Sequence, residues 1–424
     1  MWITRLHYPQ LHTACTAPSL LARGSRIQEG RDGCMSFVFI DRKHAEQLKH
    51  RVTAAEGIWG DVRGQLQRKA DQALLAGPWS VTCYGAAAPS GDPHDYTSEA
   101  PYWWPDPVNP EGPYIRKDGV TRHHRFMGHR QAIDDLSNTV FILCIAGYCL
   151  DNKRYLSRAA ELLRMWFLDP ATRMNPHIEY GEAIKGICSG RAAGVIVLRQ
   201  VDRIVHAMGF LGEYAEWQSE LDGMRQWLSQ MLDWLTTSEI GIAESKAGNN
   251  HAVWWATHVA AYAAFTGNDE KLRLAADHYK SAIIPEQVAP DGSLPKELER
   301  TRSFHYTLFN LDAMALLCEV AHYRGENLWM YATEDGRGIR QAIRFVLPYL
   351  DNPYLWQWPQ IDGEIPNEHL CMQLAAIRLN MPECNAVNVK RRGQSKLIMD
   401  CEEVLGPLIF LPGNPILRST ADIK

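Results

Sequence analysis

Apolar residues recur at intervals of three and four over most of the chain from about residue 38 onward. That interval places apolar side chains on one face of a helix, so the pattern predicts an α-helix wherever it persists. The predicted helical segments are residues 41–56, 60–76, 131–150, 152–168, 181–209, 213–237, 249–266, 268–282, 303–324, 336–349 and 367–379. No convincing run alternates apolar and polar residues as a strand would. The sequence therefore predicts an all-α protein.

Short joints connect several of these segments. At residues 150–152 and 266–269, Gly or Asn is expected to end one helix and Asn or Asp to cap the next. Such joints place consecutive helices antiparallel, and repeated helical hairpins are compatible with either an α-solenoid or an α/α toroid. The long loops 77–130 and 283–300, rich in Pro, Gly and aromatic residues, favour a cleft built over one end of a helical barrel.

The N-terminal stretch differs from the rest. Residues 1–35 contain several arginines and no continuous apolar run of the kind found in a secretory signal, so they are expected to form a poorly ordered extension. Residues 36–424 are expected to form a single domain. The richest apolar stretch, 139–150, is shorter than the roughly 18 residues of a membrane span and contains Gly147 and Tyr148, so no membrane-spanning segment is predicted.

Composition narrows the functional classes. With 46% apolar and 22% charged residues the chain is expected to fold, and a net charge of -5 provides no global field that would recruit nucleic acid or an anionic membrane. An acidic polymer would have to be held by local cations. The ten cysteines show neither CxxC pairs nor zinc-type spacing. Neither a metal nor a cofactor is predicted.

The loop 94–107 is the first candidate for chemistry. It contains Tyr102, Trp103 and Trp104 in a row among prolines, and Tyr114 follows in the stretch 112–116. These aromatic rings either fill the core or form a platform on which pyranose rings stack. Downstream, the stretch 121–130 (TRHHRFMGHR) is strongly basic, which fits either an anionic substrate or a solvated loop.

A second candidate is the turn before the helix predicted at 249–266. Asn249 has the position of an N-cap, which would satisfy free N–H groups of the first helical turn. Asn250 and His251 then fall at one mouth of the barrel, where an imidazole is accessible to a ligand. Taken alone, a histidine there is more often structural.

A third candidate is the stretch 297–306 (ELERTRSFHY). If a helix begins near residue 301 or 303, Arg302 and Tyr306 share one face of it, His305 points about 100° away, and Arg300 lies just outside. Taken singly, the arginines have an ordinary explanation as surface partners of nearby glutamates. Tyr306 taken alone would be a core tyrosine.

Three long motifs in this order resemble the alginate lyase superfamily, close to polysaccharide lyase families 5 and 38. They are SEAPYWWPDP with GPYIR, NNHAVWW, and ELERTRSFHYTLFNLDA, and the resemblance spans about residues 92–350. It implies an incomplete α/α toroid, a metal-independent lyase and an anionic polysaccharide as the partner. It also implies an extracellular or periplasmic location, although the family's usual export signal is not evident here.

The resemblance also implies a catalytic set consisting of Asn250, His251, Tyr306 and either Arg300 or Arg302. β-Elimination from a 4-linked uronate requires loss of the weakly acidic C5 proton, so donors must neutralise the adjacent carboxylate. Asn250 and one arginine suit that task, and His251 either joins them or acts as the base. The Tyr306 hydroxyl can protonate the departing O4 and, once ionised, can take the C5 proton.

Further residues are weaker candidates for substrate binding. Sugar stacking is expected of Tyr102, Trp103, Trp104 and Tyr114, while Glu182, Arg191 and His305 are expected to line the cleft. The expected polymer is a 4-linked uronate such as alginate (polymannuronate) or glucuronan, and the sequence does not distinguish mannuronate-rich alginate, guluronate-rich alginate, glucuronan and a glycosaminoglycan. Two alternatives stay open: a glycoside hydrolase on an α/α toroid, which would use two carboxyl groups from among Glu182, Asp291, Glu297 and Glu299, and a non-catalytic carbohydrate-binding protein.

Overall fold

The computed structural model describes residues 37–84, 88–361 and 369–384, and the statements below concern these residues. The chain divides into two units, Met1–Cys34 and Met35–Lys424. The first unit carries the predicted N-terminal extension and lies outside the described residues.

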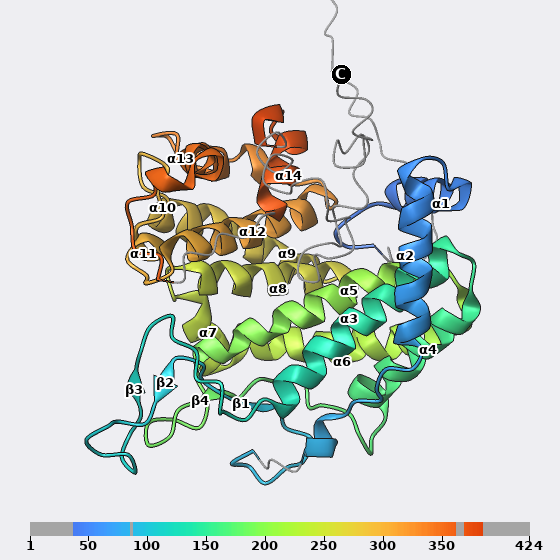
Figure 1. The fold of residues 1–424 in the computed structure, drawn as a ribbon, viewed down its shortest axis with the longest axis horizontal. Helices are drawn as coiled ribbons and strands as arrows, with labels where there is room; N and C mark the ends of the chain where they lie inside the picture. The colour runs from blue at the N-terminus through green and yellow to red at the C-terminus, as the bar shows by residue number, and fades with distance from the viewer. Residues whose placement is uncertain (1–36, 85–87, 362–368, 385–424) are drawn as a thin grey trace, which may run out of the picture. The chain divides into compact units, whose positions relative to one another are not determined.

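The described chain is built mainly of α-helices (Figure 1). They are α1 (Arg42–Ala54), α2 (Ile58–Ala73), α3 (Gly128–Cys149), α4 (Lys153–Leu163), α5 (Arg199–Leu211), α6 (Gln218–Thr237), α7 (Glu239–Ser245), α8 (Asn250–Thr266), α9 (Asp269–His278), α10 (Ile284–Gln287), α11 (Pro295–Leu298), α12 (Ser303–His322), α13 (Ile339–Asp351) and α14 (Leu370–Arg378). Short 3₁₀ and π-helical turns extend or connect several of them. The prediction of an all-α protein is confirmed.

The capping residues end and begin helices where expected. The Asn152 side chain accepts a hydrogen bond from the N–H of Arg154 at the start of α4. Gly267 ends α8 with a φ of 76°, a left-handed conformation that glycine adopts without strain, and Asn268 then caps α9. These caps join successive helices into hairpins, which confirms the prediction from the short joints.

The helix predicted at 181–209 is wrong in its first half. That stretch holds strand β4 (Tyr180–Ala183), a loop, a 3₁₀ turn over Ala192–Leu198 and only then α5. The loop backbone folds back on itself: a Cβ on Gly194 would lie 2.5 Å from the carbonyl carbon of Gly181. Glycine permits this close approach, and repeated glycines disfavour a helix.

Four short strands were also not predicted. β1 (Thr97–Glu99) pairs in parallel with β4, and β2 (Trp103–Trp104) pairs antiparallel with β3 (Ile115–Arg116). Each has only two to four residues, which is too short to produce an alternating pattern. In Figure 1 the four strands gather at one end of the helices, beside α7 and the beginning of α3.

The core lies between the helical hairpins. α8 packs mainly against α12, and α3 packs between α4 and α5. α8 is buried along almost its whole length, as its nearly continuous apolar sequence requires. α3 is the one helix of the described ranges that is long and apolar enough to cross a membrane, but 78% of its most apolar window is buried inside the protein, as in a core helix.

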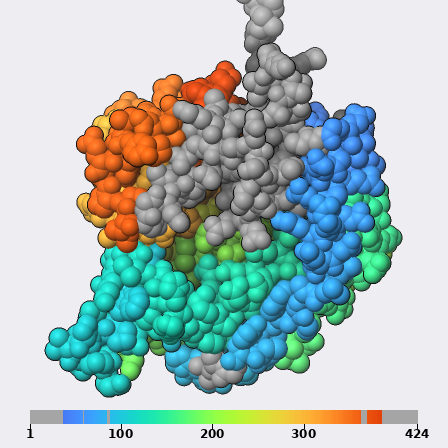
Figure 2. Space-filling view, viewed as in Figure 1, coloured from blue at the N-terminus to red at the C-terminus, as the bar shows by residue number. Residues whose placement is uncertain are grey.

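The hairpin β2–β3 contacts a distant part of the chain. After β3 the chain turns at Gly119, where a Cβ would lie 2.4 Å from the Thr301 hydroxyl oxygen and 3.1 Å from Ile361. In the space-filling view the cyan segment that contains the hairpin meets the orange segment that follows α12 (Figure 2). The hairpin therefore approaches the chain at two places, just before α12 and after α13.

Candidate active site

A cleft of about 720 Å³ lies where the strands meet the ends of α3, α7, α8 and α12. Its lining residues fall within 96–103, 125–134, 182–199, 243–251 and 300–309, together with Arg116. All three stretches singled out in the sequence contribute to it. The fold therefore brings together residues that lie up to about 200 positions apart in the chain.

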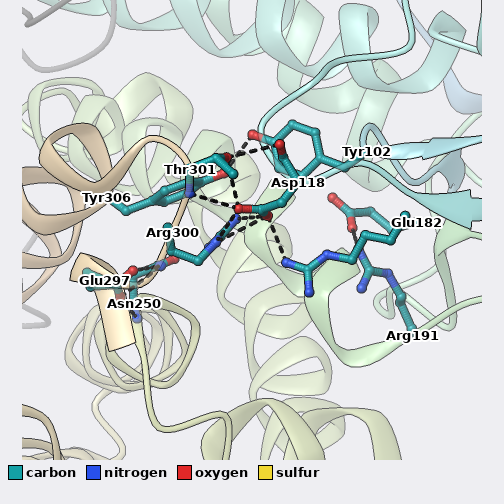
Figure 3. A network of polar contacts seen from close by, with 10 residues as sticks. Tyr102, Asp118, Glu182, Arg191, Asn250, Glu297, Arg300, Thr301 and Tyr306 are labelled. Carbon is teal, nitrogen blue, oxygen red and sulfur yellow. Dashed lines mark hydrogen bonds and ion pairs between the residues drawn. The ribbon is translucent and has the colours of Figure 1, made fainter. Parts of the chain in front are cut away.

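Tyr306 lies in the first turn of α12, between a second tyrosine and an arginine. Its hydroxyl oxygen is 2.6 Å from the hydroxyl oxygen of Tyr102. On its face, the guanidinium carbon of Arg300 lies 3.7 Å from the ring centroid, a cation–π contact. Figure 3 shows the three side chains converging from two separate segments. A phenol held in this way is oriented for proton transfer.

Asp118 fixes the position of Arg300. Both of its carboxylate oxygens accept hydrogen bonds from the Arg300 guanidinium, at 2.8 to 3.2 Å. The Thr301 N–H and hydroxyl also donate to it, and Arg116 donates at 2.8 Å. Although burial opposes ionisation, these donors and the Arg300 charge hold the pKa of Asp118 well below its usual value. Asp118 is thus a carboxylate at neutral pH.

Tyr102 and Asp118 stand at the base of the same hairpin. The Lys117 N–H donates to the Tyr102 carbonyl oxygen at 2.8 Å, just below the pairing of β2 with β3. Both ends of the hairpin therefore contact the segment 300–306: Tyr102 contacts Tyr306, and Asp118 contacts Arg300 and Thr301. The hairpin base and the start of α12 form one polar network (Figure 3).

The environment of Tyr306 keeps its hydroxyl protonated in the empty cleft. Burial raises the pKa of this phenol most strongly, and the neighbouring Tyr102 raises it further. The Arg300 guanidinium acts in the opposite direction, because a cation stabilises the phenolate. The stable form of Tyr306 in the empty cleft is therefore the phenol, and Arg300 is the neighbour that favours its ionised form.

Asn250 donates hydrogen bonds to a buried carboxylate, that of Glu297. The Asn250 N–H donates to Glu297 at 2.5 Å, and its side-chain nitrogen lies 3.0 Å from each Glu297 oxygen. Asn310 donates to the same carboxylate at 2.9 Å. Asn250 and Glu297 are each only 1% exposed, so these contacts are shielded from water. They leave the Asn250 amide little freedom to rotate.

His251 has an acidic partner of its own. Its Nδ1 lies 2.6 Å from a carboxylate oxygen of Glu244, a buried residue of α7. Burial by itself lowers the pKa of His251, but the charge and hydrogen bond of Glu244 outweigh this effect and raise the pKa above the usual value. Glu244 therefore stabilises the imidazolium form relative to a free histidine and engages Nδ1. Asn249 caps α8 by accepting from the His251 N–H, which confirms its predicted structural role.

Four of the other predicted residues line the cleft: Trp103, Glu182, Arg191 and His305. Glu182 forms an ion pair with Arg191. Its φ of 53° places its backbone in the left-handed region, which residues other than glycine adopt infrequently. The His305 ring stacks on Phe309 at a centroid distance of 5.9 Å.

Trp104 and Tyr114 do not line this cleft. The Trp104 indole donates to the Val120 carbonyl oxygen at 2.9 Å, and its face is covered by Lys117. Tyr114 lines a neighbouring cavity of about 350 Å³.

Arg302 does not line the cleft either, although helical spacing placed it on the face of Tyr306. α12 begins at Ser303, and Arg302 is its N-cap with a φ of -119°. Because Arg302 precedes the helix, the four-residue spacing that would align it with Tyr306 does not apply. Arg302 instead forms a backbone bridge with Gln360. Of the two candidate arginines, the structure places Arg300 against Tyr306.

The carboxyl groups of the cleft are already engaged, which disfavours the hydrolase alternative. Those that line it are paired with cations: Glu99 with Arg122, Asp134 with Arg130, Glu182 with Arg191, and Glu244 with His251. Asp291, Glu297 and Glu299 do not contribute to its lining. Within the ranges that the structure describes, no three His, Cys, Asp or Glu side chains come together as a metal site.

The helical-hairpin fold holds a phenol, a guanidinium, an imidazole and an amide at one cleft, the groups that an acid–base enzyme of the lyase class needs. A family model described as alginate lyase matches residues 80–356. The chain therefore belongs to the alginate lyase family and is a polysaccharide lyase.

Comparison with solved structures agrees with this assignment. The crystal structure of an alginate lyase from Bacteroides ovatus is 30% identical, with a TM-score of 0.81, and the match covers 89% of this chain and 99% of that one. This similarity confirms the predicted α/α toroid. The alginate lyase A1-III of Sphingomonas species A1 matches at 18% identity and a TM-score of 0.45, over 74% of this chain and 87% of that one. No curated protein matched the chain in a separate sequence search.

Proposed function

We propose that this protein cleaves alginate at mannuronate by β-elimination and leaves a 4,5-unsaturated uronate at the new end. The observation that carries the proposal is the contact of the Tyr306 hydroxyl with Tyr102, beside the Arg300 guanidinium and opposite Asn250 and His251. The alginate lyase family and the similarity to the Bacteroides ovatus enzyme support the choice of polymer.

The first task is neutralising the carboxylate next to C5. Asn250 and Arg300 supply this function, and His251 joins them as a cation, because Glu244 occupies its Nδ1 and raises its pKa. A protonated imidazole is an electrostatic stabiliser and not a base. Removing one preorganised donor of this kind typically costs about 10²–10³ in rate.

Tyr306 then performs both proton transfers. As a phenolate beside Arg300 it removes the C5 proton, the C5 electron pair forms the C4=C5 double bond, and the C4–O4 bond breaks. The proton just taken up by Tyr306 passes to O4, which regenerates the phenolate and completes the release of the leaving sugar. The raised pKa of Tyr306 makes its phenol form the stable one in the empty cleft, so turnover requires ionisation next to Arg300.

A single residue that acts on both C5–H and O4 requires the two groups to lie on the same face of the sugar. Mannuronate and glucuronate share the configuration at C4 and C5 and meet this requirement, whereas guluronate is inverted at C5. We therefore propose polymannuronate as the main substrate, glucuronan as a second one, and polyguluronate as a poor one. We also propose an extracellular or periplasmic location, where such polymers are encountered.

The test is to compare the wild-type protein with Tyr306→Phe and Tyr354→Phe on these three polymers. Tyr354 is 99% exposed and provides a matched control for loss of a phenol hydroxyl. We expect ultraviolet-absorbing unsaturated product from the wild type and the control, and a loss of about 10²–10⁴-fold in Tyr306→Phe with substrate binding retained. Formation of saturated product only would show a hydrolase, and binding without any product would show a carbohydrate-binding protein.

A further inference from the structure

The cleft contains arginines beyond the one at the reaction centre. Those that line it are Arg116, Arg125, Arg130, Arg191, Arg199 and Arg300. Four have carboxylate partners: Arg116 and Arg300 share Asp118, Arg130 pairs with Asp134, and Arg191 pairs with Glu182. Arg199 lies over the rings of Trp254 and Phe309.

Arg125 differs from all of these. Its Nη1 donates to the Arg122 carbonyl oxygen at 2.6 Å, which keeps the side chain in place. In the part of the chain that the structure describes, no carboxylate lies within ion-pair distance of it. The side chain is nevertheless half-buried in the wall of the cleft. It is thus a fixed guanidinium that faces the cleft with its charge not neutralised by a contacting anion.

Its neighbours increase the electrostatic cost of that charge. Burial lowers the pKa of Arg125, and the charges of Arg122 and Arg130 lower it further against the opposing effect of Glu182 and Glu99. Arg122 differs from Arg125, because it forms an ion pair with Glu99 and also donates to the carbonyl oxygens of Trp103 and His124. An anion that entered the cleft here would offset a cost that the empty protein bears.

The position of Arg125 separates it from the reaction centre. Arg125 lies in the stretch just before α3 and is held there by the Arg122 carbonyl oxygen, whereas Tyr102, Asn250, Arg300 and Tyr306 come from the hairpin base and from the starts of α8 and α12. In Figure 3, Glu182 and Arg191 lie on the opposite side of Asp118 from Asn250 and Glu297. A uronate polymer carries one carboxylate on each ring, so a chain that reacts at Tyr306 presents further carboxylates along the cleft.

We propose that Arg125 binds the carboxylate of a uronate ring other than the one that loses its C5 proton. It thereby selects substrates that are charged at more than one ring. This inference rests on the proposed function for the identity of the polymer. It also assigns a role within the basic stretch 121–130: Arg122 and Arg130 hold structural ion pairs, and Arg125 faces the substrate.

The test uses Arg125→Gln, Arg125→Lys and Arg344→Gln. Arg344 is exposed on α13, outside the cleft, so its replacement matches the change in net charge. Mannuronate oligomers of increasing length are assayed for kcat and KM. Their Kd is measured by calorimetry on the Tyr306→Phe background, in which turnover is blocked.

We expect Arg125→Gln to raise KM and Kd on the order of tenfold for long oligomers, the usual effect of losing one charge-assisted hydrogen bond, with kcat within about twofold. The effect should disappear for oligomers too short to reach Arg125, Arg125→Lys should recover part of the binding, and Arg344→Gln should behave as wild type. Unchanged Kd at every length, or an equal loss at every length, would overturn the inference while leaving the lyase assignment intact. Conversely, a length-dependent loss of binding in a protein that forms no unsaturated product would support the inference and refute the proposed function.

Discussion

Replacing Asp118 by asparagine should uncouple the hairpin β2–β3 from the reaction centre. The carboxylate receives the Arg300 guanidinium in a two-oxygen contact and also receives Thr301 and Arg116. Asparagine keeps one acceptor oxygen and turns an amide N–H₂ toward a guanidinium, so it loses one arm of the contact and the net charge. Hydrogen bonds to charged groups contribute about 1.5–3 kcal/mol each, and we take about 2 kcal/mol as the loss.

A change of about 2 kcal/mol corresponds to about 30-fold in the equilibrium that keeps Arg300 and Tyr102 in place. We therefore expect kcat/KM to fall by about 10- to 100-fold, measured by the ultraviolet absorbance of the product. Asp277→Asn, on the exposed surface of α9, is the matched control. A value of kcat/KM within about twofold of wild type for Asp118→Asn would refute the view that this ion pair holds the site together.

We also expect the effect of Asp118→Asn on the unfolding free energy to depend on pH. The pKa of Asp118 is lower in the folded protein than the value of about 3.9 expected when unfolded, so its carboxylate stabilises the fold above that pH. As the pH falls through the folded pKa this contribution is lost. The difference in unfolding free energy between wild type and Asp118→Asn should be constant between about pH 5 and 8 and should shrink below about pH 4.

Two further substitutions test the carboxylates that contact His251 and Asn250, the other residues proposed to be catalytic. Glu244→Gln should lower the pKa of His251, and because the proposed mechanism uses His251 as a cation, the alkaline limb of the pH profile of kcat/KM should move to lower pH; a shift of the acid limb instead would identify His251 as a base. Glu297→Gln should turn an N–H₂ toward the Asn250 amide, costing about 1–2 kcal/mol of unfolding free energy and about 10²-fold in kcat with little change in KM. Full activity of Glu297→Gln would contradict its role, with the exposed Glu239→Gln as control.

The helices were predictable because their signals are local. Periodic apolar residues and caps such as Asn152 and Asn249 act within a few positions of the chain, and the structure confirms them. The failure at 181–209 has a different origin, since apolar residues there suggested a helix while the backbone contact between Gly181 and Gly194 required a loop. That contact involves glycines without side chains, so no periodicity indicates it.

The residues of the candidate site were also predictable only where their signal was local in the sequence. Asn250, His251 and Tyr306 lie in motifs long enough to be found in the sequence, and the structure lines one cleft with them. The choice between Arg300 and Arg302 depended on the first residue of α12, which sequence patterns define only to within one or two positions. A contact across 182 residues joins Asp118 to Arg300, and another across 47 residues joins Glu297 to Asn250, so neither acid had a local signal. Glu244 is only seven residues from His251, but the turn between α7 and α8 had to be known to pair them.

The hairpin β2–β3 is attached by polar contacts, so the free energy that holds it in place is separate from the free energy that holds the helices together. The helices are held by a large apolar core, whereas Tyr102 and Asp118 are joined to α12 and the residues before it mainly by hydrogen bonds and one ion pair. Because these contacts can open while the core stays folded, the fraction of molecules competent for catalysis is set by a local equilibrium. Evolution can therefore adjust turnover through the hairpin sequence without drawing on the stability of the helical fold.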